Sequence, residues 1–239
     1  MTDETSEQHW KSKLARSAMV AALGGKPSND PLASWFGRVS VGSEGELWPR
    51  FRGRPLAPIC QINLSQLRER PAALDGIAFM TVFVTPDFAY IDTFHADEPM
   101  PTDDIGWCLR SYASLDRLVP LKAPALDRCP RAFPISFGKV VDDYPTHDLL
   151  PGEMPDDLKA RYYDLGWEKN WANTKLGGWP SCCQSEPNWH YSPEMEGFEF
   201  ALQIASEPKA EWSWGDGGVI CIARHKTQRS RWALDWQCY

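Results

Sequence analysis

The sequence lacks an excess of basic residues. Its 239 residues include 25 Lys and Arg against 32 Asp and Glu, a formal net charge of −7. General nucleic-acid binders show a basic face, so we expect no direct nucleic-acid binding. Long hydrophobic runs are also missing, because no uncharged stretch approaches membrane-spanning length. The N-terminus has neither the basic start nor the apolar core of a signal peptide. We therefore expect a soluble, cytoplasmic protein without a membrane partner.

Catalytic and metal-binding motifs are equally scarce. Neither a P-loop nor a G-x-G-x-x-G pattern is present. Residues 42–45 read Gly-Ser-Glu-Gly, which is the wrong spacing for a nucleophile elbow. The five histidines are isolated, and no two of the seven cysteines have C-x-x-C spacing. We expect no cofactor, no metal site and no catalytic residue.

The cysteines indicate packing rather than chemistry. Cys60 and Cys221 lie inside apolar runs and are expected to be small buried hydrophobes. The adjacent Cys182 and Cys183 could form a redox pair, although unreactive packing is commoner for such residues.

Tryptophan is abundant, with 12 residues in the chain. Tryptophan is usually largely buried with its N–H paired, so we expect most of them in the core. Exposed tryptophans at a binding surface are the alternative.

Residues 5–23 are expected to form an amphipathic helix. Thr5 and Gln8 have capping-box spacing, and Trp10, Leu14, Ala18 and Ala22 recur every four residues. Gly24-Gly25 and then Pro27 end the pattern. We assign residues 1–27 to this helix, packed outside a single domain over residues 28–239.

Further elements follow from composition. Residues 77–84, 107–115 and 133–141 have the β-branched and aromatic character of strands. Residues 156–165 can form a short helix with acids in its first turn. Residues 119–134 contain four prolines and indicate a connector.

The stretch over residues 176–223 resembles an earlier one. Trp48-Pro49 is paired with Trp179-Pro180, and Gln61-Ile62 with Gln203-Ile204. A glycine follows 15 residues after each glutamine, but the gap from Trp-Pro to Gln-Ile is 13 residues in one copy and 24 in the other. We predict an internal duplication with an insertion in the second copy. The halves cover about 35–115 and 133–239.

Three polar residues could line a crevice between these halves. Asp216, in the turn Gly-Asp-Gly-Gly, could act as a base or ligand, but turn aspartates more often bond nearby backbone N–H groups. Gln61 and Gln203 could grip a ligand from matching positions. Satisfying buried backbone groups is the commoner use of such residues.

Two stretches carry acids without Lys or Arg, at residues 85–106 and 142–157. Solvated loops are the commonest fate of such runs. In an inhibitor, the same charges would steer a basic partner.

Several motifs together resemble the YwqG-like family. They are Pro55-Leu-Ala-Pro-Ile-Cys-Gln-Ile-Asn-Leu64, Leu176-Gly-Gly-Trp-Pro180 with Gln184, Leu202-Gln-Ile-Ala-Ser206 and Trp214-Gly-Asp-Gly-Gly218. The resemblance implies one β-rich α+β domain from a bacterial family of unknown function. Some members occur beside polymorphic toxins, which implies an immunity or antitoxin role, including against type VI secretion effectors. The chain departs from the family pattern at Cys182-Cys183, where larger residues are common.

We therefore expect a β-rich α+β fold of two unequal related halves. The expected function is a non-catalytic immunity protein that binds and occludes a cognate toxin, possibly a nuclease. The alternative is an enzyme or small-ligand binder that uses Gln61, Gln203 and Asp216 in the crevice. The residues expected to contact a toxin are Asp142, Asp143, Asp156, Asp157, Trp167, Trp171 and Trp189.

Overall fold

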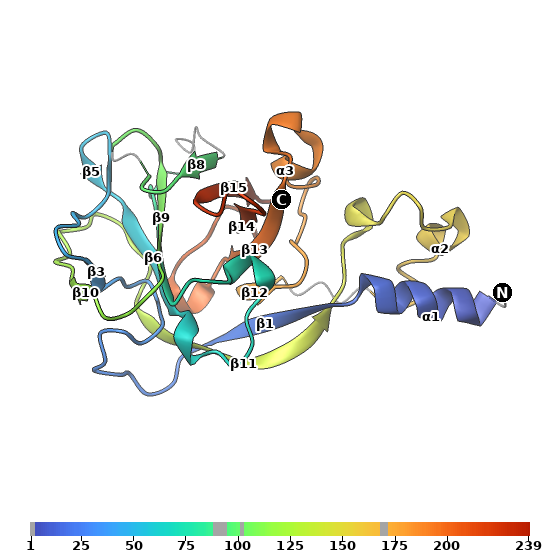
Figure 1. The fold of residues 1–239 in the computed structure, drawn as a ribbon, viewed down its shortest axis with the longest axis horizontal. Helices are drawn as coiled ribbons and strands as arrows, with labels where there is room; N and C mark the ends of the chain where they lie inside the picture. Colours follow the sequence, from blue (N-terminus) through green and yellow to red (C-terminus); the bar gives the residue numbers. More distant parts are fainter. Residues whose placement is uncertain (1–2, 88–94, 101–102, 168–171) are drawn as a thin grey trace.

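The protein is built around one large antiparallel sheet. In the computed structural model, which describes residues 3–87, 95–100, 103–167 and 172–239, the sheet has 11 strands in the order β8-β15-β14-β13-β12-β1-β11-β2-β6-β7-β9. The sheet curves strongly (Figure 1). Its strands are β1 (Arg16–Leu23), β2 (Trp35–Phe36), β6 (Ala57–Asn63), β7 (Phe79–Val84), β8 (His95–Asp97), β9 (Trp107–Tyr112), β11 (Phe133–Asp143), β12 (Lys175–Gly177), β13 (Phe198–Ala205), β14 (Val219–His225) and β15 (Arg231–Gln237).

Smaller elements decorate this sheet. Two short ribbons pair β3 (Val41–Ser43) with β10 (Leu118–Pro120) and β4 (Arg50–Phe51) with β5 (Arg54–Pro55). The helices are α1 (Asp3–Leu14), α2 (Asp156–Ala160) and α3 (Asn188–Tyr191), with 3-10 turns at Leu64–Gln66, Ala72–Leu74, His147–Leu149, Pro193–Met195 and Pro208–Ala210. Figure 1 shows α1 and α2 together in a lobe that projects from one end of the molecule. The β-rich α+β class expected from the sequence is confirmed.

The predicted strands are confirmed with small shifts at their ends. Residues 77–84, 107–115 and 133–141 correspond to β7, β9 and β11. The helix expected over residues 156–165 is shorter, because α2 ends at Ala160 and a series of turns follows.

The N-terminal prediction is correct for α1 and wrong for residues 16–23, which form β1 in the middle of the sheet. The periodic residues are spaced by four, and that spacing keeps residues on one face of a helix and equally on one face of a strand. Pairing with β11 on one side and β12 on the other decides for the strand. The N-terminal segment is therefore part of the sheet, and only α1 lies outside it.

The two halves repeat the same strand arrangement, as the duplication predicts. Gln61 lies on β6, which pairs with β7, and Gln203 lies on β13, which pairs with β14. Trp35 on β2 faces Gln61 across the ladder, and Lys175 on β12 faces Gln203. The register also shifts just before each glutamine, which places a β-bulge at the same point in both halves.

The pairing of Trp48-Pro49 with Trp179-Pro180 is wrong, and so is the insertion inferred from it. Equivalent positions are identified by the glutamine side chains: Gln61 Oε1 accepts the N–H of Ser40, 21 residues earlier, and Gln203 Oε1 accepts the N–H of Ser181, 22 residues earlier. With these anchors the two gaps differ by a single residue.

The halves are not fully separate in the sheet. β8 comes from the sequence of the first half but pairs with β15 of the second. β1 and β11 form the junction, because β11 continues to β2 of the first half and β1 to β12 of the second.

The main hydrophobic core lies against the sheet and confirms the expected use of tryptophan. Ten tryptophans are buried in the described residues, and Trp107, Trp212, Trp214 and Trp232 are the largest of the fully buried side chains. Cys60 and Cys221 are buried, as expected. A separate cluster holds the α1 lobe together and consists of Trp10, Leu14, Tyr144, Met154, Leu158, Tyr162 and Trp167.

Candidate functional site

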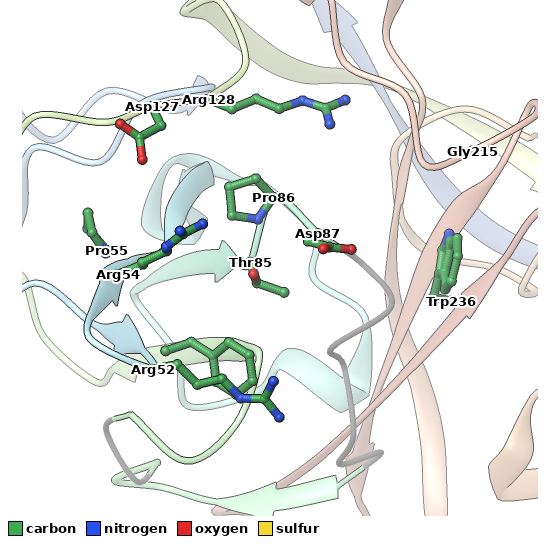
Figure 2. Close-up of a pocket in the computed structure, with 11 residues that line it drawn as sticks. Arg52, Arg54, Pro55, Thr85, Pro86, Asp87, Asp127, Arg128, Gly215 and Trp236 are labelled. Carbon is green, nitrogen blue, oxygen red and sulfur yellow. The ribbon is translucent and has the colours of Figure 1, made fainter.

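A cavity of about 840 Å³ opens between the two halves of the protein (Figure 2). The first half supplies the β4–β5 ribbon and the segment that follows β7, and the second supplies Gly215 and Trp236. The connector between the halves supplies Asp127 and Arg128. The lining residues are Phe51, Arg52, Arg54, Pro55, Thr85, Pro86, Asp87, Asp127, Arg128, Gly215 and Trp236. A crevice between the halves therefore exists, but its lining differs from the one expected.

The β4–β5 ribbon is held rigidly at the edge of this cavity. Arg52 and Gly53 form its turn with φ of 51° and 74°. Two successive positive φ values define the tight hairpin turn that matches the twist of the strands. Asp103 fixes the turn from outside, because its Oδ1 accepts the Gly53 N–H at 2.6 Å and its own N–H bonds Arg50 O at 2.9 Å. Phe51 anchors the ribbon in the core at 5% exposure.

Arg52 is an unusual residue for this turn. The left-handed region suits glycine, asparagine and aspartate, and a long side chain there carries a backbone strain of about 1 kcal/mol or more. Backbone strain of this kind concentrates at binding sites, where the surrounding structure holds it. Arg52 therefore lines the cavity from a backbone conformation that arginine rarely adopts.

Three arginines give the cavity its electrostatic character. Arg54 is exposed, and its guanidinium makes no hydrogen bond or ion pair with any part of the chain that the structure describes. Arg128 lies over the ring of Trp212 at 5.6 Å, and Arg52 over the ring of Phe51 at 4.8 Å. The lining contains three arginines and two aspartates. It is locally cationic in a chain whose net charge is −7.

Gln61 and Gln203 do not line the cavity, because both are fully buried and bonded within their own halves. Gln61 Nε2 donates to Ala33 O at 2.6 Å, and Gln203 Nε2 to Asn173 O at 3.0 Å. Each glutamine thus joins two loop segments to its strand, the structural role that the sequence left open. The proposal that they grip a ligand is wrong.

Asp216 is exposed, and only its backbone is used: Asp216 O accepts the N–H of Tyr239 at 3.0 Å. Among the described residues its carboxylate has no hydrogen-bond partner, so the expected bond to nearby backbone is wrong. The glycines shape this turn instead. A Cβ at Gly218 would lie 2.4 Å from the carbonyl oxygens of Gln237 and Trp214.

The expected acidic contact surface is broken at Asp143. Asp142, Asp156 and Asp157 are exposed, but Asp143 is fully buried and forms an ion pair with buried Lys175 at 2.9 Å. Its Oδ2 also accepts the backbone N–H of Trp179 at 2.7 Å. Asp143 is therefore an internal structural group, and its place in a contact surface is wrong. The alternation of a strand explains the difference from Asp142, since neighbours on β11 face opposite sides.

The expected aromatic anchors are core residues where the structure describes them. Trp167 packs in the α1 lobe at 5% exposure, and Trp189 is 6% exposed in a second core cluster that also contains Phe198. Trp171 lies outside the described residues. An aromatic ring that sequence reasoning missed is Tyr163, which is 54% exposed and stacks on His147.

The vicinal cysteines are not a reactive pair. Both thiols are free and half-buried, and burial raises the pKa of Cys182 to about 12 and also raises that of Cys183. Nucleophilic and redox-active cysteines have a lowered pKa, so these two contribute packing.

Asp235 is a buried carboxyl near these cysteines. Burial raises its pKa to about 6, although the hydrogen bonds from Gln237 and from the backbone of Asn188 lower it. Gln237 Nε2 donates to Asp235 at 2.7 Å and also to Ser185 O at 3.0 Å, while its Oε1 accepts Cys183 N–H. Asp235 therefore supports the loop that carries the cysteines.

This arrangement predicts that Asp235→Asn stabilises the protein at neutral pH. A carboxyl whose folded pKa is raised from 3.8 to about 6 contributes stability below pH 3.8 that is lost as pH rises to 6. At neutral pH, ionising the buried carboxyl lowers the free energy of unfolding by about 3 kcal/mol, and asparagine avoids this loss. Asparagine also has one acceptor fewer, which costs about 1 kcal/mol, so the net gain in stability is about 2 kcal/mol. Urea unfolding at pH 7.5 and pH 5 measures it. The gain should be about 1.5 kcal/mol smaller at pH 5, and an equal gain at both pH values contradicts the prediction.

Other kinds of site are not found in the described part of the chain. No group of three or more His, Cys, Asp or Glu side chains is placed to hold a metal ion among residues 3–87, 95–100, 103–167 and 172–239. None of the helices described there has the length and apolar character needed to cross a lipid bilayer.

The fold and the cavity together define a curved antiparallel sheet protein with a crevice between two related halves. The chain belongs to the family described as domain of unknown function (DUF1963), which it matches over residues 34–238. The match leaves out α1 and β1, so the central strand β1 lies outside it. A search of curated proteins gives no match.

Proposed function

We propose that this protein binds a small anionic molecule in the crevice between its halves. The observation that carries the proposal is Arg54, a guanidinium without a partner among the described residues, in a cavity shared with Arg52 and Arg128. The planar guanidinium presents donors that match carboxylate and phosphate oxygens, often two at a time. This proposal keeps the small-ligand alternative of the sequence analysis, but the arginines replace Gln61, Gln203 and Asp216 as the binding residues.

The dimensions of the site suit a small molecule. Ligand pockets typically measure roughly 300–1,000 Å³, and this cavity measures about 840 Å³. Its position between two parts of a fold is also common for ligand sites. The bond from Asp103 keeps the backbone that carries Arg52 and Arg54 in place before the ligand arrives, which reduces the entropy cost of binding.

The test compares thermal unfolding with and without pyrophosphate and citrate, a phosphate and a carboxylate probe. A ligand at ten times its Kd adds about 1.4 kcal/mol and should raise Tm by about 4 °C. Arg54→Gln and Arg128→Gln should each reduce this shift by half or more, and low salt should increase it in the parent.

The matched control is Arg117→Gln. Arg117 is exposed, lies outside the cavity and also has no partner among the described residues. Its variant should keep the full shift. The proposal is rejected when neither probe shifts the parent, or when Arg54→Gln responds as Arg117→Gln does.

Toxin neutralisation is the second candidate. Three of the expected acids, Asp142, Asp156 and Asp157, are exposed, and Tyr163, which follows α2 in the chain, has an exposed ring. Acidic charges steer a basic partner, and an aromatic ring beside them can carry affinity. The candidate surface now excludes Asp143, Trp167 and Trp189.

Changing these three acids to lysine should slow association with a protein partner recovered by co-purification. The association rate should fall about tenfold or more at low salt, because steering is lost, and should depend less on salt. Stopped-flow kinetics measures both effects. The control changes Glu44, Glu69 and Asp104, which are exposed elsewhere, to lysine. Equal rates for the two triple variants, or no recovered partner, would contradict this function.

A further inference from the structure

One wall of the cavity is aromatic and lies across from the arginines of the β4–β5 ribbon. Figure 2 shows Trp236 on the far side of the opening from Arg54 and Pro55. The indole Nε1 donates to the backbone oxygen of Trp214 at 2.7 Å, so its N–H is satisfied and the ring is held in position. Trp236 is only partly buried. A fixed and partly open indole face is a stacking surface for a planar ring.

The two aspartates of the lining add a second requirement. Asp127 is exposed and has no hydrogen-bond partner in the described residues, and Asp87 lines the same cavity. Carboxylates repel a simple anion, but they accept hydrogen bonds from hydroxyl and amino groups. A ligand that suits the whole lining therefore carries its negative charge at one end and hydrogen-bond donors elsewhere.

We infer that the ligand is a nucleotide or a close chemical equivalent, a phosphorylated molecule with a planar ring and donor groups. This inference rests on the proposed anion-binding function. The phosphate lies against the guanidinium groups of Arg54 and its neighbours, and the ring stacks on Trp236. Hydroxyl or amino groups of the ligand donate to Asp127, which Figure 2 shows on the same side of the opening as Arg54. A cavity of about 840 Å³ has room for all three parts.

The experiment measures Kd by isothermal titration for ribose 5-phosphate and for AMP, GMP, CMP and UMP. In the parent, at least one nucleotide should bind about fivefold or more tightly than ribose 5-phosphate, because stacking one base on an aromatic ring is worth at least that ratio. Trp236→Leu should remove this ratio and leave ribose 5-phosphate binding unchanged. Trp236→Phe, which keeps a smaller ring, should retain part of the nucleotide preference. This variant replaces Trp236→Leu in the test if the leucine variant does not fold. Asp127→Asn should weaken nucleotide binding more than pyrophosphate binding.

The possible outcomes test nucleotide binding separately from anion binding. Pyrophosphate binding that depends on Arg54, with all four nucleotides no tighter than ribose 5-phosphate, overturns the nucleotide inference and leaves anion binding intact. A nucleotide advantage that survives in both Trp236 variants also overturns it. Absence of binding by every probe, pyrophosphate included, overturns both.

Discussion

Replacing Lys175 with methionine should destabilise the protein by about 3–5 kcal/mol, because it removes the buried ammonium group that pairs with the carboxylate of Asp143. Both side chains are fully buried, with Lys175 Nζ 2.9 Å from Asp143 Oδ2. Burial lowers the pKa of Lys175, and the nearby carboxylate of Asp143 opposes this effect. Burying this ion pair costs free energy, but removing only one of its two charges costs far more. Urea unfolding at pH 7.5 measures the loss.

The control is the double variant Asp143→Asn with Lys175→Met. Removing both charges should recover most of the lost stability, since a buried pair replaced as a unit is often close to neutral. Asparagine also keeps an acceptor for the backbone N–H of Trp179, which bonds Asp143 at 2.7 Å. A double variant as unstable as Lys175→Met would mean that the loss comes from packing rather than from the broken ion pair.

Sequence reasoning recovered β7, β9 and β11 and the repeated position of the two glutamines, because both depend on local patterns. Gln61 and Gln203 have equal spacing to the next strand, and that strand is strongly apolar in both halves. The anchors before the glutamines were misassigned, because Trp-Pro is a conspicuous dipeptide whereas Ser40 and Ser181 are recognisable only from the hydrogen bonds they make.

The strand β1 illustrates the limit of periodicity. A spacing of four residues fits a helix face and a strand face equally well, so the pattern from Trp10 to Ala22 could not separate α1 from β1. The deciding contacts come from Lys139 and Val140 on β11 and from Lys175 on β12, which lie far along the chain.

The candidate site was mostly beyond sequence reasoning. The basic run Arg50, Arg52, Arg54 is visible in an acidic chain, but one of its members, Arg50, donates to Gly53 O inside the ribbon. Which arginines face a cavity depends on the turn and on its contact with Asp103. Arg128 and Trp236 join them only through the tertiary fold. The four acids predicted to form one contact surface do not all lie on it. Asp142 and Asp143 occupy opposite faces of β11, so one is exposed and the other is buried.

Glu98 connects the two edges of the curved sheet, and its removal carries the other large predicted effect. It follows β8, and its carboxylate accepts the backbone N–H and the hydroxyl of Ser111 on β9 as well as Trp232 Nε1 on β15. β8 and β9 are the two edge strands of the sheet and are not paired through their backbones. The side chain of Glu98 joins them instead. Burial raises the pKa of Glu98, while these hydrogen bonds lower it.

Glu98→Ala should therefore destabilise the protein by about 3 kcal/mol, because three donors lose one shared acceptor. Ser111→Ala, which removes the hydroxyl and keeps the backbone bond, should cost only about 1 kcal/mol. The alanine variant at Glu98 should also associate as its concentration rises, since the backbone N–H of Ser111 on the edge strand β9 then loses its acceptor. Urea unfolding and light scattering of both variants measure these effects. Equal losses for the two substitutions would show that the hydroxyl bond alone matters, and that Glu98 does not join the edges of the sheet.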